Sequence, residues 1–320
     1  LFEQNLEDST RILDPHHPDT LLSRNNLAFA YQTAGRLHEA IKLFEQNLED
    51  STRILDPHHP DTLLSRNNLA FAYQTAGRLH EAIKLFEQNL EDSTRILDPH
   101  HPNTLTTRHN LANAYKTAGR LEEAIALFEQ NLEDHTHILG PAHPVTLTAR
   151  NNLASAYHDA GRLDEAIALF EQTLEDRTRI LGPRHPNTLT SRNNLAIAYH
   201  NAGRLDEAIP LLEQTLEDST RILGPHHPDT LLSRNNLAIA YQDAGRLDEA
   251  ITLYEQTLKD CTRILGPHHP HTLTTRHHLA EAYRAAGRFD DADSLFKTPS
   301  DSEEDEQKDS EDNPDQETDS

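Results

Sequence analysis

The sequence repeats itself every 42 residues. Seven Ala-Gly-Arg triplets mark the period, and a His-Pro pair recurs at the same spacing, from His17-Pro18 to His269-Pro270. A period of about 20 to 50 residues is typical of solenoid proteins, in which each repeat contacts only its neighbours. Such a chain forms a long continuous surface, and that surface is the first place to look for a functional site.

Each repeat contains two apolar patterns with helical spacing. In the first complete repeat, Leu27, Ala28 and Tyr31 fall on one face of a helix that Pro18 can start and Gly35 can end. A second apolar stripe of about 19 residues follows, which corresponds to roughly 28 Å of helix. Gly-Pro follows this stripe in four later repeats, whereas Asp-Pro, a weaker stop, holds that place earlier. The pattern predicts an all-α fold, an α-solenoid of stacked helical hairpins.

The residues around the first turn resemble the tetratricopeptide repeat. The matching segments are 26–31 (Asn-Leu-Ala-Phe-Ala-Tyr), 34–37 (Ala-Gly-Arg-Leu) and 39–41 (Glu-Ala-Ile). The usual unit has about 34 residues, and the longer second helix makes this chain similar to the kinesin-light-chain type. The resemblance covers residues 1–297, as a partial first unit at 1–13 and then seven helix pairs. It implies a right-handed superhelix of helix-turn-helix units.

The chain departs from the family pattern at Arg24 and its six equivalents, where an apolar residue is usual. Arginine is rarely buried without a partner, but its stem can cover apolar surface while the guanidinium reaches an acid. We expect Glu49 or Asp50 to pair with Arg66 and thereby join one repeat to the next. A role of these arginines in ligand binding is the alternative.

The sequence offers little support for catalysis. All eleven glycines lie in the repeated turns, so none remains for a phosphate-binding loop. No Cys-His-acid pattern is visible, and Cys261 is expected to be an exposed or half-buried side chain. Twelve of the 22 histidines lie in the recurring His-Pro turns, and we interpret them as turn and helix-cap residues. Sensitivity to pH is the alternative for them, and we expect no enzyme activity, cofactor or metal site.

Charge and composition narrow the choice of partner. The net charge of −24 argues against nucleic acid and against an anionic membrane surface. No apolar run is long enough to span a bilayer. The single cysteine excludes an intrachain disulfide, which is consistent with a reducing compartment, and we expect a cytoplasmic protein.

The resemblance places a binding groove on the first helix of each repeat. In tetratricopeptide arrays this helix lines the concave face, and asparagines before the Leu-Ala pair bond to the backbone of an extended peptide. A carboxamide suits that task because it offers both a donor and an acceptor. The alternative is an inter-helix hydrogen bond that sets repeat curvature. The predicted groove residues are Asn25, Asn26, Phe29, Asn67, Asn68, Phe71, Asn110, Lys116, Asn151, Asn152, Asn193, Asn194, Asn235 and Asn236.

Comparison between repeats separates constant from variable positions. The position of Tyr31 is always tyrosine, whereas that of Phe29 reads Phe, Phe, Asn, Ser, Ile, Ile, Glu along the chain. The position of Gln32 varies as freely. A constant frame with varied positions suits recognition of a specific partner, and drift on a solvated face is the alternative. An apolar patch is expected at the N-terminal end, from Leu22, Phe29, Leu64 and Phe71.

The two ends differ from the array. Residues 298–320 hold eleven acids, one lysine and no aliphatic residue, which predicts a disordered acidic tail. The chain starts inside a repeat, and residues 1–42 are identical to 43–84, so we expect a piece of a longer reading frame. The helix expected at 1–13 lacks a partner helix, and its exposed apolar face could serve self-association.

Together these patterns predict a non-enzymatic scaffold that binds an extended peptide or a partner protein in its groove. The alternative is a regulatory or sensor arm of a larger multidomain signalling protein, for instance one fused to an ATPase. The residues that precede Leu1 in the reading frame would distinguish the two.

Overall fold

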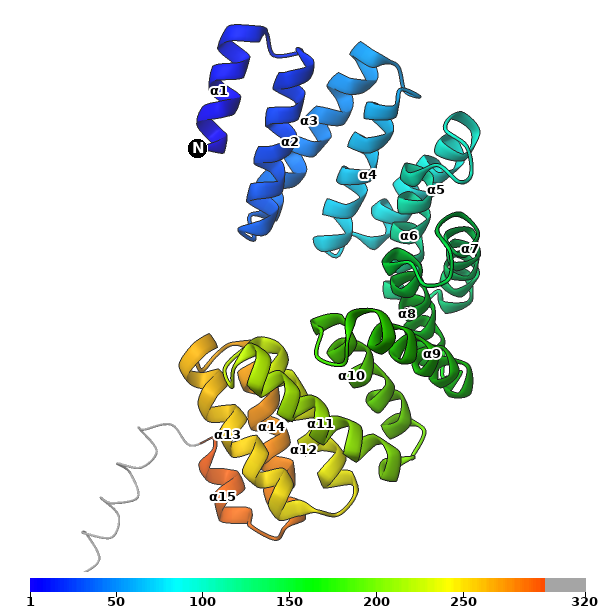
Figure 1. Ribbon diagram of the computed structural model, residues 1–320. Coiled ribbons are helices and arrows are strands. Elements are labelled where there is room, and N and C mark those ends of the chain that lie inside the picture. Colours follow the sequence, from blue (N-terminus) through cyan, green and yellow to red (C-terminus); the bar gives the residue numbers. More distant parts are fainter. Residues whose placement is uncertain (297–320) are drawn as a thin grey trace, which may run out of the picture. The chain divides into compact units, whose positions relative to one another are not determined.

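The computed structural model describes residues 1–296, which form fifteen α-helices and no strand (Figure 1). Seven repeats each contain a helix A, even-numbered from α2 to α14, and a helix B, odd-numbered from α3 to α15; α1 is the helix B of a partial repeat. The bounds are α1 (Phe2–Leu13), α2 (Pro18–Thr33), α3 (Leu37–Leu55), α4 (Pro60–Thr75), α5 (Leu79–Ile96), α6 (Pro102–Thr117), α7 (Leu121–Leu139), α8 (Pro144–Asp159), α9 (Leu163–Leu181), α10 (Pro186–Asn201), α11 (Leu205–Leu223), α12 (Pro228–Asp243), α13 (Leu247–Leu265), α14 (Pro270–Ala285) and α15 (Phe289–Ser294).

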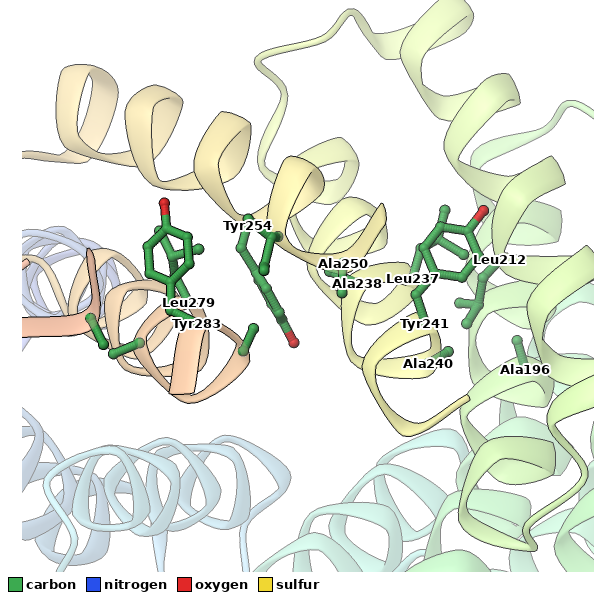
Figure 2. Close-up of a cluster of buried hydrophobic side chains, with 14 residues drawn as sticks. Ala196, Leu212, Leu237, Ala238, Ala240, Tyr241, Ala250, Tyr254, Leu279 and Tyr283 are labelled. Carbon is green, nitrogen blue, oxygen red and sulfur yellow. The ribbon is translucent and has the colours of Figure 1, made fainter. Parts of the chain in front are cut away.

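Consecutive helices pack against each other, which confirms the predicted α-solenoid. The contacts divide the chain into two compact parts, Leu1–Leu169 and a second part that begins at Phe170. Figure 2 shows the core of the second part, where Tyr241 of α12, Tyr254 of α13 and Tyr283 of α14 lie among small side chains. Ala238 and Ala250 are fully buried there. Alanine at these positions lets neighbouring helices approach closely enough to exclude water from the aromatic rings.

A histidine caps each helix A, and this accounts for the recurring His-Pro pair. In α2 the Nδ1 atom of His17 accepts a hydrogen bond of 3.2 Å from the backbone N–H of Asp19, while Pro18 occupies the first helical position. The same cap recurs at the start of the other six helices A. Proline costs nothing at this position because the first N–H groups of a helix have no intrahelical partner. The interpretation of these histidines as cap residues is confirmed.

The Ala-Gly-Arg triplet ends each helix A and leads into helix B of the same repeat, beside a tyrosine that bonds to the preceding repeat. In α2 the N–H of Arg36 bonds to the carbonyl of Tyr31 at 2.8 Å, and Gly35 has a φ of 76°, as in a Schellman motif. The Arg36 guanidinium then lies 4.0 Å from the centroid of the Tyr31 ring. One repeat later, the Tyr73 hydroxyl donates to Glu45 of the preceding helix B at 2.6 Å. Burial and this bond raise the pKa of Tyr73 to about 12.

In five of the repeats a buried or largely buried ion pair holds helix A against helix B. Arg24 donates to Asp50 at 2.6 Å, and its other terminal nitrogen donates to the carbonyl of Pro15 at 3.2 Å. Arg66 bonds in the same way to Asp92 at 2.6 Å. The same pair recurs as Arg108–Asp134, Arg192–Asp218 and Arg234–Asp260.

The expected pairing of Arg66 with Glu49 or Asp50 is therefore wrong. The long helix B runs back antiparallel to its own helix A, which places Asp92 level with Arg66. The contact stabilises a repeat internally, and other contacts join successive repeats. A second correction concerns Cys261, which is 3% exposed. Its position is on the side of helix B that faces the next helix A, where the equivalent Ser51 contacts Ser65.

The ends of the described chain carry less packing than its middle. Helix α1 has no buried residue, as expected for a helix B without its helix A. The predicted acidic tail at 298–320 lies outside the described residues. Within residues 1–296, no helix combines the length and apolar character needed to cross a bilayer.

The aspartates that end three helices B adopt an unfavourable backbone conformation. Asp56 has φ 102° and ψ 144°, a region populated almost only by glycine, and its carboxylate accepts the N–H of His58 at 2.8 Å. Asp56→Gly is expected to raise the free energy of unfolding by about 1 kcal/mol because the relieved strain exceeds the lost bond. Urea denaturation followed by circular dichroism measures this. The reverse change, Gly140→Asp, should destabilise, and a gain in stability there would contradict the argument.

Removal of one partner of the buried pair should be costly. Arg66→Leu leaves the carboxylate of Asp92 buried and is expected to lower the free energy of unfolding by about 3 to 5 kcal/mol. Arg95→Leu is the matched control: Arg95 bonds to the same carboxylate at 2.9 Å but is exposed, and should cost less than about 1 kcal/mol. The double change with Asp92→Leu should recover most of the loss. Equal midpoints for the two single variants in urea would refute the anchoring role.

Candidate binding surface on the A helices

The predicted groove asparagines bond to one another across repeats. Asn68 of α4 donates to the side-chain oxygen of Asn25 in α2 at 3.0 Å. The same contact recurs from Asn110 to Asn67 at 3.2 Å and from Asn236 to Asn193 at 3.1 Å. Each pair therefore links two successive A helices, which is the alternative considered from the sequence. The side-chain oxygen of the donor asparagine and the NH₂ group of the acceptor asparagine are not used in this bond.

Three of the other groove asparagines, Asn26, Asn152 and Asn235, differ from these pairs. Asn26 precedes the first pair and is exposed, because the partial repeat before it contributes no helix A to the described chain. The side chain of Asn152 has no hydrogen-bond partner within residues 1–296, and the Asn235 oxygen is buried without a partner in the described chain. Asn151 and Asn194 occupy the equivalent positions on α8 and α10.

A second row of contacts lies near the C-terminal ends of the A helices. Gln32 donates to Thr75 at 2.9 Å. Lys116 lies 3.0 Å from Asp159, and His200 lies 2.7 Å from Asp243. These are positions that vary between repeats, and in these examples they vary as pairs: Gln32 faces a threonine, whereas Lys116 and His200 each face an aspartate in the next repeat. Their variation therefore reflects contacts between successive repeats. A comparison of each residue with the residue 43 positions later in the sequence would have revealed these pairs.

The variable position of Phe29 remains open to solvent. Leu22, Phe29, Leu64 and Phe71 are 58%, 37%, 49% and 43% exposed, respectively. They lie on α2 and α4 at spacings of seven residues, which places each pair on one helix face. We call these four side chains the apolar patch.

The apolar patch borders a pocket between α2, α3 and α4. Its volume is about 270 Å³, and Leu22, Leu64, Asn25 and Asn68 are among the residues that line it. The patch thus combines apolar side chains with a paired set of amides that have unused donors and acceptors. Asp19 and Asp61 also line this pocket, so its rim is acidic.

The described residues hold no group of three or more His, Cys, Asp or Glu side chains arranged to bind a metal ion. This absence includes the histidine-rich segment 268–278. There His269 caps α14 and stacks on His271, with ring centroids 5.3 Å apart.

A model of the tetratricopeptide repeat family matches the chain over residues 1–49, 20–88, 61–133, 116–179, 145–218, 192–259 and 229–298. The chain belongs to the tetratricopeptide repeat family. A solved structure from Podosopora anserina, described as a kinesin light chain with nearly identical TPR-like repeats, is similar to this tetratricopeptide array. It is 36% identical, with a TM-score of 0.58, over 64% of this chain and 97% of that one. The predicted 42-residue, kinesin-light-chain-like type is confirmed.

Other tetratricopeptide arrays share the fold at lower identity. BtubC (BKLC) from P. vanneervenii is 20% identical with a TM-score of 0.59, over 76% of this chain and 96% of that one. The apo quorum sensor NprR from B. thuringiensis is 17% identical with a TM-score of 0.70, over 92% and 79%. No curated protein sequence matches the chain significantly.

The paired asparagines should contribute to stability only where a preceding helix A exists. Asn110→Ala removes the donor to Asn67 and is expected to cost about 0.5 to 1.5 kcal/mol of unfolding free energy. Asn26→Ala makes the same change at the same helix position without such a partner, and should leave the urea midpoint unchanged. Equal losses in both variants would contradict a stacking role.

Proposed function

We propose that this tetratricopeptide array is a non-enzymatic scaffold that binds an extended segment of a partner protein on its A helices. Membership of the family supports the general role, because tetratricopeptide repeats are protein-interaction modules. The apolar patch is the observation that supports the location. Four large exposed apolar side chains on two neighbouring helices, two of which line a pocket, are typical of a protein-interaction site.

The chemistry of the apolar patch indicates how a partner segment would bind. An apolar side chain of the partner would enter the pocket between α2 and α4 and cover Leu64. The unused amide groups of Asn25 and Asn68 would then meet the N–H and C=O groups of the partner backbone. A backbone contact of this kind accepts many sequences, so the pocket would supply most of the selectivity.

The charge around the apolar patch favours one class of partner. Asp19 and Asp61 stand at the rim of the pocket, and the whole chain carries a net charge of −24. A partner segment with Lys or Arg beside its apolar anchor would therefore associate faster than an acidic one. We propose such a basic-apolar segment as the occupant.

The double variant Leu64→Thr/Phe71→Ser tests the proposal. Both new residues occur naturally at these positions in other repeats, as Thr106 and Ser155, so the fold should be retained. The variant is expected to lose at least tenfold in affinity for the partner because the apolar anchor loses its contacts. Partners are identified by affinity capture from a lysate with mass spectrometry, and their affinity is measured by calorimetry.

Leu232→Thr is the matched control, since it makes the same change at the same helix position in the sixth repeat. Proteins captured by the natural chain and by this control, but lost with the double variant, would support the proposal. If the double variant captures the same partners at the same affinity, the apolar patch is not the binding site.

A further inference from the structure

The contact between the third and fourth repeats lacks a polar contact that other repeats keep. Each helix A carries Ser or Thr at the position that faces the preceding helix B, except α8, which carries Ala149. The residue that faces Ala149 is His135 of α7, and its Nδ1 atom is buried without a hydrogen-bond partner in the described chain. At three other junctions a direct polar contact forms here: Ser9–Ser23 at 3.1 Å, Ser51–Ser65 at 3.3 Å and Arg177–Ser191 at 2.8 Å.

The same pair of repeats also lacks the asparagine contact. Asn152 of α8 would bond to the residue at position 109, which is His109 here instead of asparagine. The Nε2 atom of His109 is engaged by the Asn113 amide at 2.9 Å, and its ring packs edge-on against Phe128, with centroids 5.8 Å apart. Asn152 consequently keeps its full hydrogen-bonding capacity within the described residues.

These groups line a pocket of about 410 Å³ between α6, α7 and α8. We call it the repeat 3–4 pocket. Its walls are mainly apolar, and its polar groups include His109, His135 and Asn152. The apolar walls are formed by Leu105, Ile138, Leu139 and Val145 together with Ala149. The volume lies within the range of about 300 to 1,000 Å³ that small-molecule sites occupy.

Two histidines of the pocket, His109 and His135, are held in the uncharged form near neutral pH. Burial lowers the pKa of His109, and the nearby His135 lowers it further. Burial also lowers the pKa of His135; Arg108 and His143 act in the same direction, whereas Asp134 opposes them. The Asp134 carboxylate is itself bonded to Arg108, and His100 at the pocket margin lies 3.3 Å from it. The imidazole rings of His109 and His135 are therefore neutral hydrogen-bonding groups in an apolar pocket.

We propose that the repeat 3–4 pocket binds a small uncharged molecule with an apolar body and a hydrogen-bonding end, such as a phenol or an alcohol. The apolar walls take up the body of the ligand. Its polar end meets Asn152 and the histidines, which have unused hydrogen-bonding capacity. A charged ligand is disfavoured because an ion would lose its hydration without gaining a counter-charge. This site is separate from the apolar patch, so it does not depend on the proposed partner binding.

The probe for a first test is 4-fluorophenol, with its binding followed by ¹⁹F NMR relaxation on the full chain. Saturable binding is expected for 4-fluorophenol, with at least tenfold weaker binding of 4-fluorobenzoate. The double variant His135→Ser/Ala149→Ser restores the serine pair found at Ser51 and Ser65, and should weaken 4-fluorophenol binding at least tenfold. His137→Ser, which changes an exposed histidine on the same helix, should leave it unchanged.

A second variant fills the pocket without touching a histidine. Thr148→Leu introduces the residue that the first, second and sixth repeats carry at this position, and it should also abolish binding. Circular dichroism verifies that each variant keeps its helicity. Unchanged 4-fluorophenol binding in both pocket variants, or equal binding of 4-fluorobenzoate, would overturn the proposal.

The pH dependence gives an independent readout. Because the pKa values of His109 and His135 lie below the ordinary value of about 6.5, both stay neutral above that pH. The affinity for 4-fluorophenol should therefore stay constant between about pH 8 and about pH 7. It should fall at lower pH, as imidazolium forms in the pocket. Binding that strengthens on acidification would contradict a site for neutral ligands.

Discussion

The buried arginine–aspartate pair is the contact on which the architecture of each repeat depends. It joins the two helices at the end away from their connecting turn, where the long helix B would otherwise be held by apolar contacts alone. The same arginine bonds to the carbonyl of the proline in the turn before helix A, so one side chain fixes three segments. Because the guanidinium and the carboxylate are both buried, neither can exchange its partner for water at low cost.

Successive repeats are joined by a different set of contacts, most of them between A helices. The Asn68–Asn25 bond lies in the middle of these helices, and the Gln32–Thr75 bond lies near their C-terminal ends. The tyrosine–glutamate bond adds a link from helix A to the preceding helix B. The surface expected to recognise a partner therefore also carries the stacking contacts, and the four exposed side chains of the apolar patch take no part in them.

Much of this fold could be predicted from the sequence because the 42-residue period repeats each local signal seven times. Proline, glycine and the apolar stripes located the helices, and the His-Pro pair located the caps. The partner of Arg66 could not be predicted in this way. Asp50 and Asp92 are equivalent residues of neighbouring repeats, so residue type does not distinguish them, and only the antiparallel packing of helix B brings Asp92 to the correct level.

The candidate site shows the same limit. The exposed apolar residues at Leu22 and Phe71 followed from helical spacing, whereas the pairing of Asn68 with Asn25 depends on how close two A helices approach. In the repeat 3–4 pocket, Ala149 presents an apolar wall where other repeats carry Ser or Thr, and this difference gives no signal until the facing residue is known. Local chemistry is thus visible in one repeat, while contacts between repeats require the structure.

The paired variable positions also determine where an array of this kind can grow. Residues 1–42 and 43–84 are identical, so a further copy inserted beside them presents the same Gln32 and Thr75 contacts to both neighbours. A copy of the first repeat inserted after the third repeat would instead separate Lys116 from Asp159. Each of these two charged side chains would then face an uncharged residue of the inserted copy. Matched charges therefore fix the order of the later repeats, and duplication without loss of stability is confined to the uniform N-terminal end.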